Sequence, residues 1–246
     1  MEPGKNIINW DNVFKQSQSF KNNEPFMFAF VEEFIQQEFY EKLFETYPKL
    51  DDMWNELNTI VKYQFNREWN PKKPSEIVSD EEDPTLSSYW NEFKQYVQSE
   101  EFIENFRKFS GVPVTKLKAL RFIDYRRGGF TVPHAHNLGP STLILMLYFS
   151  KNWKKGDPGG TFMATDSNEE SIIFEPYNLD NTMAIFHDGE NAFHGTRYIT
   201  KDVERHAIQL TLEEYSSESG WSAGTQDEQT EQKREELREI EKYLQC

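Results

Sequence analysis

A chain of 246 residues, of which 37% are hydrophobic and 28% charged, is long enough for one domain with short appendages. Its net charge of −15 argues against a general nucleic-acid binder and against docking on an anionic membrane, because both need clustered Lys and Arg. A cytoplasmic protein is expected: no signal-peptide pattern opens the chain, no apolar run approaches the roughly 18 residues that span a bilayer, and Cys246 is the single cysteine.

The N-terminal part combines a polar segment with a strand and a helix. Residues 1–24 are polar with scattered aromatic residues, and we expect them to be a lead-in that packs in places. The apolar run 25–30 predicts a short strand. Residues 31–47 have helical spacing and Pro48 would end the helix, with one shared apolar face formed by Phe34, Phe39, Leu43 and Phe44.

Residues 67–85 are predicted to form a loop, because three prolines interrupt them and an acidic run occupies 79–83. We expect a solvated surface loop, and a mobile lid over a site is the alternative. The aromatic residues just before it either face a substrate or belong to the core; they are Tyr63, Phe65 and Trp69.

Two helices follow, at 86–98 and from Ser99 to about Gly111. Ser99 is predicted to be the N-cap of the second helix, with glutamates in its first turn, and Gly111 its C-terminal cap. Both helices have an apolar stripe rich in aromatic residues, so we expect them to support the outside of a sheet.

The pattern changes to short strands from residue 117 onward. Turn residues separate strands at 117–125, 142–149, 161–164, 171–174, 182–186 and 206–212, a spacing typical of an all-β sandwich or barrel. Residues 213–224 are predicted to be a linker. The charged tail 226–246 has a thin apolar stripe, which predicts a helix that is docked, mediates a homodimer, or is solvated.

Histidines occur where strands are expected to end. His134 and His136 would point the same way from an extended backbone, since strand side chains alternate. His194 lies downstream, and Arg205 follows it. An H-x-H pair is more often not a metal site, but the buried strands around these residues would hold them rigidly, as a metal site requires. The set predicts a mononuclear metal centre with an anionic co-substrate.

The order of these motifs resembles the prolyl-4-hydroxylase-like branch of the iron(II)/2-oxoglutarate-dependent oxygenases. The resemblance covers about 117–215 and extends upstream to 25–26. It is carried by Tyr125, Gly128-Gly129, Pro133-His134, Leu147-Tyr148-Phe149, Trp153, Gly159-Gly160, Pro176, Phe186, His194 and Arg205. It implies a mainly β fold with flanking α-helices and a double-stranded β-helix (jelly roll) core. The implied domain is 25–215, with helical support over 31–111, the jelly roll over 112–215, and a linker and tail over 216–246.

The resemblance also implies a chemistry. A dioxygenase of this kind uses Fe(II), molecular oxygen and 2-oxoglutarate to hydroxylate an unactivated C–H bond, here in a small molecule or a prolyl side chain. His134 and His194 would bind the metal. Arg205 would pair with the far carboxylate of 2-oxoglutarate, because a guanidinium matches a carboxylate with two parallel bonds. Tyr148 and, more weakly, Tyr125 would donate hydroxyl hydrogen bonds to the same co-substrate.

One position departs from the pattern, because His136 stands where the family has a carboxylate ligand. His136 is interpreted as a third metal ligand, as a residue that swings away and leaves the position to water or an anion, or as the mark of a weakened or engineered relative. A neutral ligand in place of a carboxylate leaves one more positive charge on the metal. We therefore expect coordination by His136 to lower oxygenase activity.

Two other functions are compatible with the same residues. One is a three-histidine metal dioxygenase that does not use 2-oxoglutarate, and the other is a non-catalytic metal- or ligand-binding jelly roll. Neither would need a buried Arg205. Of the nearby residues, His187 and His206 are not expected to bind the metal, while Asp188 and Glu190 are candidate replacement carboxylates.

Overall fold

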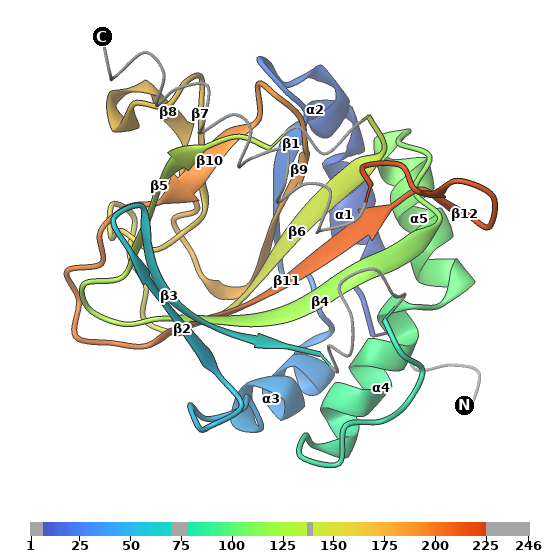
Figure 1. Ribbon diagram of the computed structural model, residues 1–246, viewed down its shortest axis with the longest axis horizontal. Coiled ribbons are helices and arrows are strands. Elements are labelled where there is room, and N and C mark those ends of the chain that lie inside the picture. The colour runs from blue at the N-terminus through green and yellow to red at the C-terminus, as the bar shows by residue number, and fades with distance from the viewer. Residues whose placement is uncertain (1–6, 70–77, 137–139, 225–246) are drawn as a thin grey trace, which may run out of the picture.

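The computed structural model describes residues 7–69, 78–136 and 140–224. Eleven antiparallel strands form one curled sheet (Figure 1). Along the sheet they run β1 (Phe28–Glu32), β9 (Asp180–His187), β6 (Thr142–Phe149), β11 (Arg205–Glu213), β4 (Lys116–Tyr125), β3 (Lys62–Glu68), β5 (Phe130–His134), β10 (Phe193–Thr196), β7 (Phe162–Ala164) and β8 (Ile172–Phe174), and β2 (Asn55–Thr59) pairs with β3. The predicted mainly β fold with a jelly-roll core is confirmed.

Helices cover one face of this sheet (Figure 1). They are α1 (Trp10–Lys15), α2 (Ser17–Asn22), α3 (Gln37–Glu45), α4 (Ser88–Val97) and α5 (Glu100–Ser110). The α5 termini are built as the sequence predicts: the Ser99 side chain accepts a hydrogen bond from the Phe102 amide at 3.3 Å, and Gly111 is left-handed with φ of 78°. No helix in the described part of the chain is long and apolar enough to cross a membrane.

The strand β6 shows why the core has two layers. All eight of its residues are buried, so polar and apolar residues do not alternate along this strand. Leu145 and Leu147 pack in the cluster between sheet and helices, whereas Met146 and Tyr148 pack in the cluster inside the curl. A strand that is covered on both faces therefore reads as one apolar run.

The N-terminal prediction needs two corrections. Val31 belongs to β1, where it is the partner of Met183 in β9, and the helix begins only at Gln37. The Asn181 side chain bonds both backbone groups of Ile35 and holds the chain extended ahead of the helix. Part of the expected lead-in is helical, because α1 and α2 pack into the helical layer through the Trp10 contacts with Phe102 and Phe106 and the Phe20 contact with Phe109.

The loop prediction for 67–85 is also partly wrong. Arg67 is in β3 and forms an ion pair at 3.2 Å with Asp83, which is buried although it ends the acidic run. Trp69 is a core residue that stacks on Phe122. The lid hypothesis falls largely on 70–77, outside the described residues.

Residues 213–224 are not a free linker. Glu213 ends β11 and is fully buried, and its carboxylate accepts hydrogen bonds from Lys118 at 2.7 Å and from the amide of Ala223 at 2.7 Å. A small hairpin follows, made of β12 (Tyr215–Ser216) and β13 (Gly220–Trp221). The predicted tail and its homodimer contact lie outside the described residues.

Candidate metal and co-substrate site

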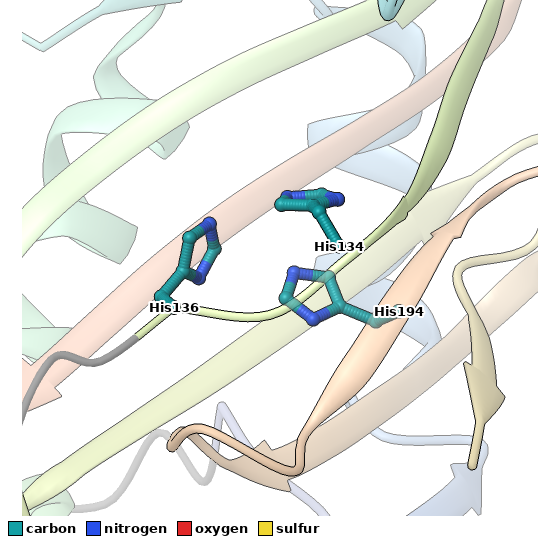
Figure 2. Close-up of side chains that lie close together, drawn as sticks. All are labelled: His134, His136 and His194. Carbon is teal, nitrogen blue, oxygen red and sulfur yellow. The ribbon is translucent and has the colours of Figure 1, made fainter. Parts of the chain in front are cut away.

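Three histidines lie close together where β5 and β10 pair (Figure 2). His134 ends β5 and His194 lies in β10, where the two are directly opposed partners with ring centroids 4.4 Å apart. His136 follows two residues after His134, with its ring centroid 4.8 Å from that of His134 and 5.0 Å from that of His194. One ligand nitrogen from each lies within 4.8 Å of the others, so the group could hold a metal ion.

The hydrogen bonds of these rings select one tautomer. His134 donates Nδ1–H to the carbonyl of Val132 at 3.0 Å, and His194 donates Nδ1–H to the carbonyl of Ala192 at 2.7 Å. His136 Nδ1 lies 3.3 Å from the Asp188 carboxylate, which can only accept. Each ring therefore presents Nε2 as its lone-pair nitrogen, which is the form that binds a metal.

Burial also favours the neutral form of His194. This side chain is only 7% exposed, and burial is the main cause that lowers its pKa well below the usual value, followed by His134 and His136. A neutral imidazole is the state that a metal requires, so no proton has to leave His194 when the metal binds near neutral pH.

Gly195 explains how β10 can lie so close to β5. A Cβ at this position would come within 2.5 Å of the Thr131 carbonyl oxygen and 2.7 Å of the Phe162 ring. Any larger residue would push the strands apart. The glycine after His194 therefore keeps the two cross-strand histidines within reach of one ion.

Arg205 lies at the start of β11 and is fully buried. Its guanidinium lies 5.0 Å from the ring of Tyr125 and 4.9 Å from that of Tyr148, and it donates to the Gly159 carbonyl at 2.6 Å and to Thr161 Oγ1 at 3.3 Å. The remaining nitrogen, Nη1, is buried and has no hydrogen-bond partner among the described residues. A buried cation with an unused donor is suited to an anionic ligand.

Both predicted tyrosines have their rings close to that guanidinium. Tyr148 OH accepts a hydrogen bond from the Thr161 amide at 2.9 Å, and burial raises the Tyr148 pKa, so its own proton stays available for donation. The hydroxyl of Tyr125 is already engaged by Gln64 at 2.5 Å and Thr131 at 2.7 Å. Of the two, Tyr148 keeps a hydroxyl proton to donate, whereas Tyr125 is the one that lines the cavity.

A cavity of about 100 Å³ is lined by the three histidines and by Tyr125. Its wall contains the three histidines, an apolar side from the inner faces of β4, β6 and β9, and two cationic side chains. The lining residues are Lys62, Gln64, Arg121, Ile123, Tyr125, Thr131, His134, His136, Ile144, Met146, Thr161, Phe186, His194, Gly195, Thr196 and Gln209. Arg205 lies behind this wall, in contact with Tyr125 and Thr161.

The other candidate residues named from the sequence lie outside the three-histidine group. Asp188 touches His136 but does not join the group of ligand atoms, and Glu190 is exposed. His187 Nε2 lies 2.9 Å from the Pro140 carbonyl. His206 lies on the helix-covered face against Tyr47, as expected from its alternation with Arg205. It forms a second group of potential ligands with Asp124 and Glu204.

Sequence reasoning did not identify Gln64, Thr131 or Thr161 as site residues. Lys62 and Gln64 are two apart in β3, which is the period of one strand face, so a prediction of the β2–β3 hairpin would have found them. Thr161 follows the Gly159-Gly160 pair that the sequence did single out. The donor set fits a metal and a dicarboxylate: three imidazole nitrogens at the cavity and one buried guanidinium with an unused donor.

No family model matches the sequence, and no curated protein matches it in sequence. Solved structures do match the fold. A prolyl-4-hydroxylase from Pseudomonas putida is 10% identical with a TM-score of 0.55, covering 82% of this chain and 97% of that one. A 2OG-Fe(II) oxygenase family oxidoreductase from Burkholderia pseudomallei is 10% identical with a TM-score of 0.54, covering 92% and 94%.

A third match is HygX from Streptomyces hygroscopicus, solved with nickel, 2-oxoglutarate and hygromycin B. It is 12% identical with a TM-score of 0.51, covering 80% of this chain and 86% of that one. At such low identity these likenesses establish the fold. The chain therefore has the fold of the iron(II)/2-oxoglutarate oxygenases, including the prolyl-4-hydroxylase-like branch that its sequence resembles.

Proposed function

We propose that the protein is an Fe(II)- and 2-oxoglutarate-dependent dioxygenase that hydroxylates an unactivated C–H bond. The observation that carries this proposal is the pairing of a three-histidine group with a fully buried arginine in a fold shared with such oxygenases. A buried guanidinium is costly unless an anion compensates it. Its unused Nη1, next to the cavity wall, supports a carboxylate ligand at this position.

The residues then have separate tasks. His134, His136 and His194 hold the metal through Nε2. Bound Fe(II) would supply oxygen activation, and the reaction would convert O2, 2-oxoglutarate and the substrate C–H bond into succinate, carbon dioxide and the hydroxylated substrate. Arg205 pairs with the far carboxylate of the co-substrate, and Tyr148 donates its hydroxyl proton to it. The apolar side chains of Ile144, Met146 and Phe186 limit water around the site, which strengthens these charged contacts.

The substrate is proposed to be a small molecule or a prolyl side chain. Two neighbours support both classes, since one is a prolyl-4-hydroxylase and the other is solved with hygromycin B. Lys62 and Arg121 also line the cavity, where Arg121 forms an ion pair with Glu68. The cytoplasm is the proposed location, in keeping with the single cysteine.

The convergence of three imidazoles also favours a second candidate, a three-histidine dioxygenase that does not use 2-oxoglutarate. Imidazole binds iron, nickel, copper and zinc. This alternative assigns no role to the buried Arg205. Binding of 2-oxoglutarate therefore separates the two candidates.

The test is calorimetric titration of 2-oxoglutarate into protein loaded with Mn(II), a redox-stable substitute for Fe(II). Wild type should bind one equivalent, and Arg205→Ala should lose about 2–5 kcal/mol of binding free energy, the usual cost of removing one partner of a buried charge pair. Arg126→Ala is the matched control, because Arg126 forms an exposed pair with Glu204. Equal affinity in wild type and Arg205→Ala would sink the assignment of Arg205.

A further inference from the structure

His136 differs from the other two histidines in what holds its ring. His134 and His194 are held by the backbone carbonyls of the residues two positions before them. His136 is held by a side chain from the residue after β9, with Nδ1 3.3 Å from Oδ1 of Asp188. The one histidine that replaces a carboxylate ligand of the resembled family is thus the one with a carboxylate behind it.

Asp188 is deeply placed. It directly follows β9, its side chain is fully buried, and its amide donates to the Thr142 carbonyl at 3.0 Å, which fixes the backbone at the end of the strand. Its second carboxylate oxygen has no hydrogen-bond partner within the described ranges. Burying a carboxylate is unfavourable without a donor or a nearby cation, so the contact with His136 is the main compensation that the structure offers.

Asp188 is not placed to bind the metal directly. The ligand atoms of His134, His136 and His194 lie within 4.8 Å of one another, and Asp188 is not a member of that group. Its carboxylate lies on the Nδ1 side of His136, whereas the metal-binding nitrogen is Nε2, across the ring. The carboxylate therefore acts through the imidazole.

We propose that Asp188 is a positioning residue of the metal centre. It fixes the tautomer and orientation of His136 and restores, behind the imidazole, the negative charge that a carboxylate ligand would have placed on the metal. A carboxylate that accepts from Nδ1–H makes Nε2 more basic and binds a metal ion more tightly. His136 and Asp188 thus act as one unit. The His136 imidazole binds the metal, and the Asp188 carboxylate accepts the hydrogen bond from its Nδ1–H.

This inference rests on the proposed metal site and gives His136 a defined purpose. A neutral histidine alone would leave the ion with one more positive charge. The buried Asp188 carboxylate supplies a compensating negative charge on the far side of the His136 ring. The site is then a complete three-histidine centre in which His136 is a functional metal ligand.

The test measures Mn(II) binding by calorimetry in the absence of 2-oxoglutarate. Wild type should bind one equivalent. Asp188→Asn, which keeps the shape and removes the charge, should weaken binding about 10–100-fold, the typical effect of losing such a partner. Glu190→Gln is the matched control. It removes the same charge from an exposed side chain two positions further along the chain, so the Mn(II) affinity should stay unchanged.

A background variant separates positioning from a general structural effect. His136→Ala keeps the directly opposed pair His134 and His194 and should bind Mn(II) weakly. In this background the further change Asp188→Asn should cause no additional loss of affinity, because the carboxylate has no ring to act through. An equal loss in both backgrounds would overturn the inference. Asp188→Ala, a second variant without an amide, should show the same loss and the same dependence on His136.

The outcomes are distinguishable from those of the proposed function. If wild type binds no Mn(II) at all, the proposed metal site is wrong and this inference is wrong with it. If wild type binds Mn(II) and Asp188→Asn binds it equally well, only the role of Asp188 is refuted. Thermal unfolding of the metal-free variants should stay close to that of wild type, which keeps the affinity comparison valid.

Discussion

Arg205 Nε donates a hydrogen bond of 2.6 Å to the carbonyl oxygen of Gly159, a residue whose φ is +144°. The contact helps to orient the buried guanidinium near the rings of Tyr125 and Tyr148 and leaves Nη1 for a ligand. Gly159 must be a glycine, since a Cβ there would lie 2.4 Å from the Trp153 ring. Gly159, the first glycine of the pair singled out in the sequence, therefore helps to position the Arg205 guanidinium.

Gly159→Ala should displace this carbonyl and disturb Arg205. We expect a loss of about 1–3 kcal/mol in stability from backbone strain and the clash with Trp153. Binding of 2-oxoglutarate should weaken, while binding of Mn(II) alone stays unchanged. Gly156→Ala is the control: its φ is +92°, but a Cβ there would meet no atom within 4 Å. Equal 2-oxoglutarate affinity in both variants would argue against the role of the Gly159 carbonyl.

Replacing His134 or His194 by alanine should abolish stoichiometric Mn(II) binding. The two rings are the directly opposed cross-strand pair, so each variant leaves only one member of that pair to hold the metal. Calorimetry and the melting temperature with and without Mn(II) measure the effect, since a bound metal stabilises only the folded state. His187→Ala should behave like wild type in both measurements. Retained binding in both His134→Ala and His194→Ala would rule out the site.

A carboxylate at position 136 should support more oxygenase activity when the Asp188 carboxylate is removed than when it is kept. His136→Asp alone would set a second carboxylate near the buried Asp188 without a donor between them, and like charges disfavour each other there. The pair His136→Asp with Asp188→Asn restores two histidines and one carboxylate. Succinate formation should therefore be faster in the double variant than in His136→Asp. The opposite ranking would show that the two positions are not coupled.

Asp124 should make stability depend on pH. It is 1% exposed, and burial, followed by the charge of Glu204, raises its pKa from 3.8 to about 7. The folded protein therefore holds a proton that the unfolded chain has released, so the free energy of unfolding falls as pH rises from about 4 to about 7. His206, Arg126, Arg205 and Tyr47 also face or influence this group.

Asp124→Asn removes the titration with little change in shape. Its stability relative to wild type should grow across the same pH interval, by up to about 4 kcal/mol for a shift of this size. Urea unfolding at pH 5 and pH 8 measures the difference. A difference that is the same at both pH values would contradict the raised pKa of Asp124.

The parts of the fold with strong local patterns could be predicted. The strand 142–149 was placed correctly because it is apolar throughout, and the second helix of the pair was placed by Ser99 and Gly111. Val31 was assigned to a helix because its strand partner, Met183, is 152 positions away and leaves no local trace. The buried state of Asp83 was missed for the same reason, since it depends on the ion pair with Arg67.

The candidate site shows the same division. The three histidines and Arg205 could be singled out by spacing and by resemblance. The contact between His136 and Asp188 joins residues 52 positions apart and depends on how the end of β9 lies against the segment after β5. The sequence named Asp188 only as a replacement ligand, whereas in the structure it stands behind the ring of His136.

The most direct test of the account is a stoichiometric assay of 2-oxoglutarate consumption. Purified protein is given Fe(II), 2-oxoglutarate and O2, and succinate formation and O2 uptake are measured in parallel for wild type, Arg205→Ala and His194→Ala. We predict succinate and O2 uptake in a 1:1 ratio for wild type and a loss of both in the two variants. No 2-oxoglutarate-dependent succinate or O2 uptake in metal-loaded wild type would contradict it.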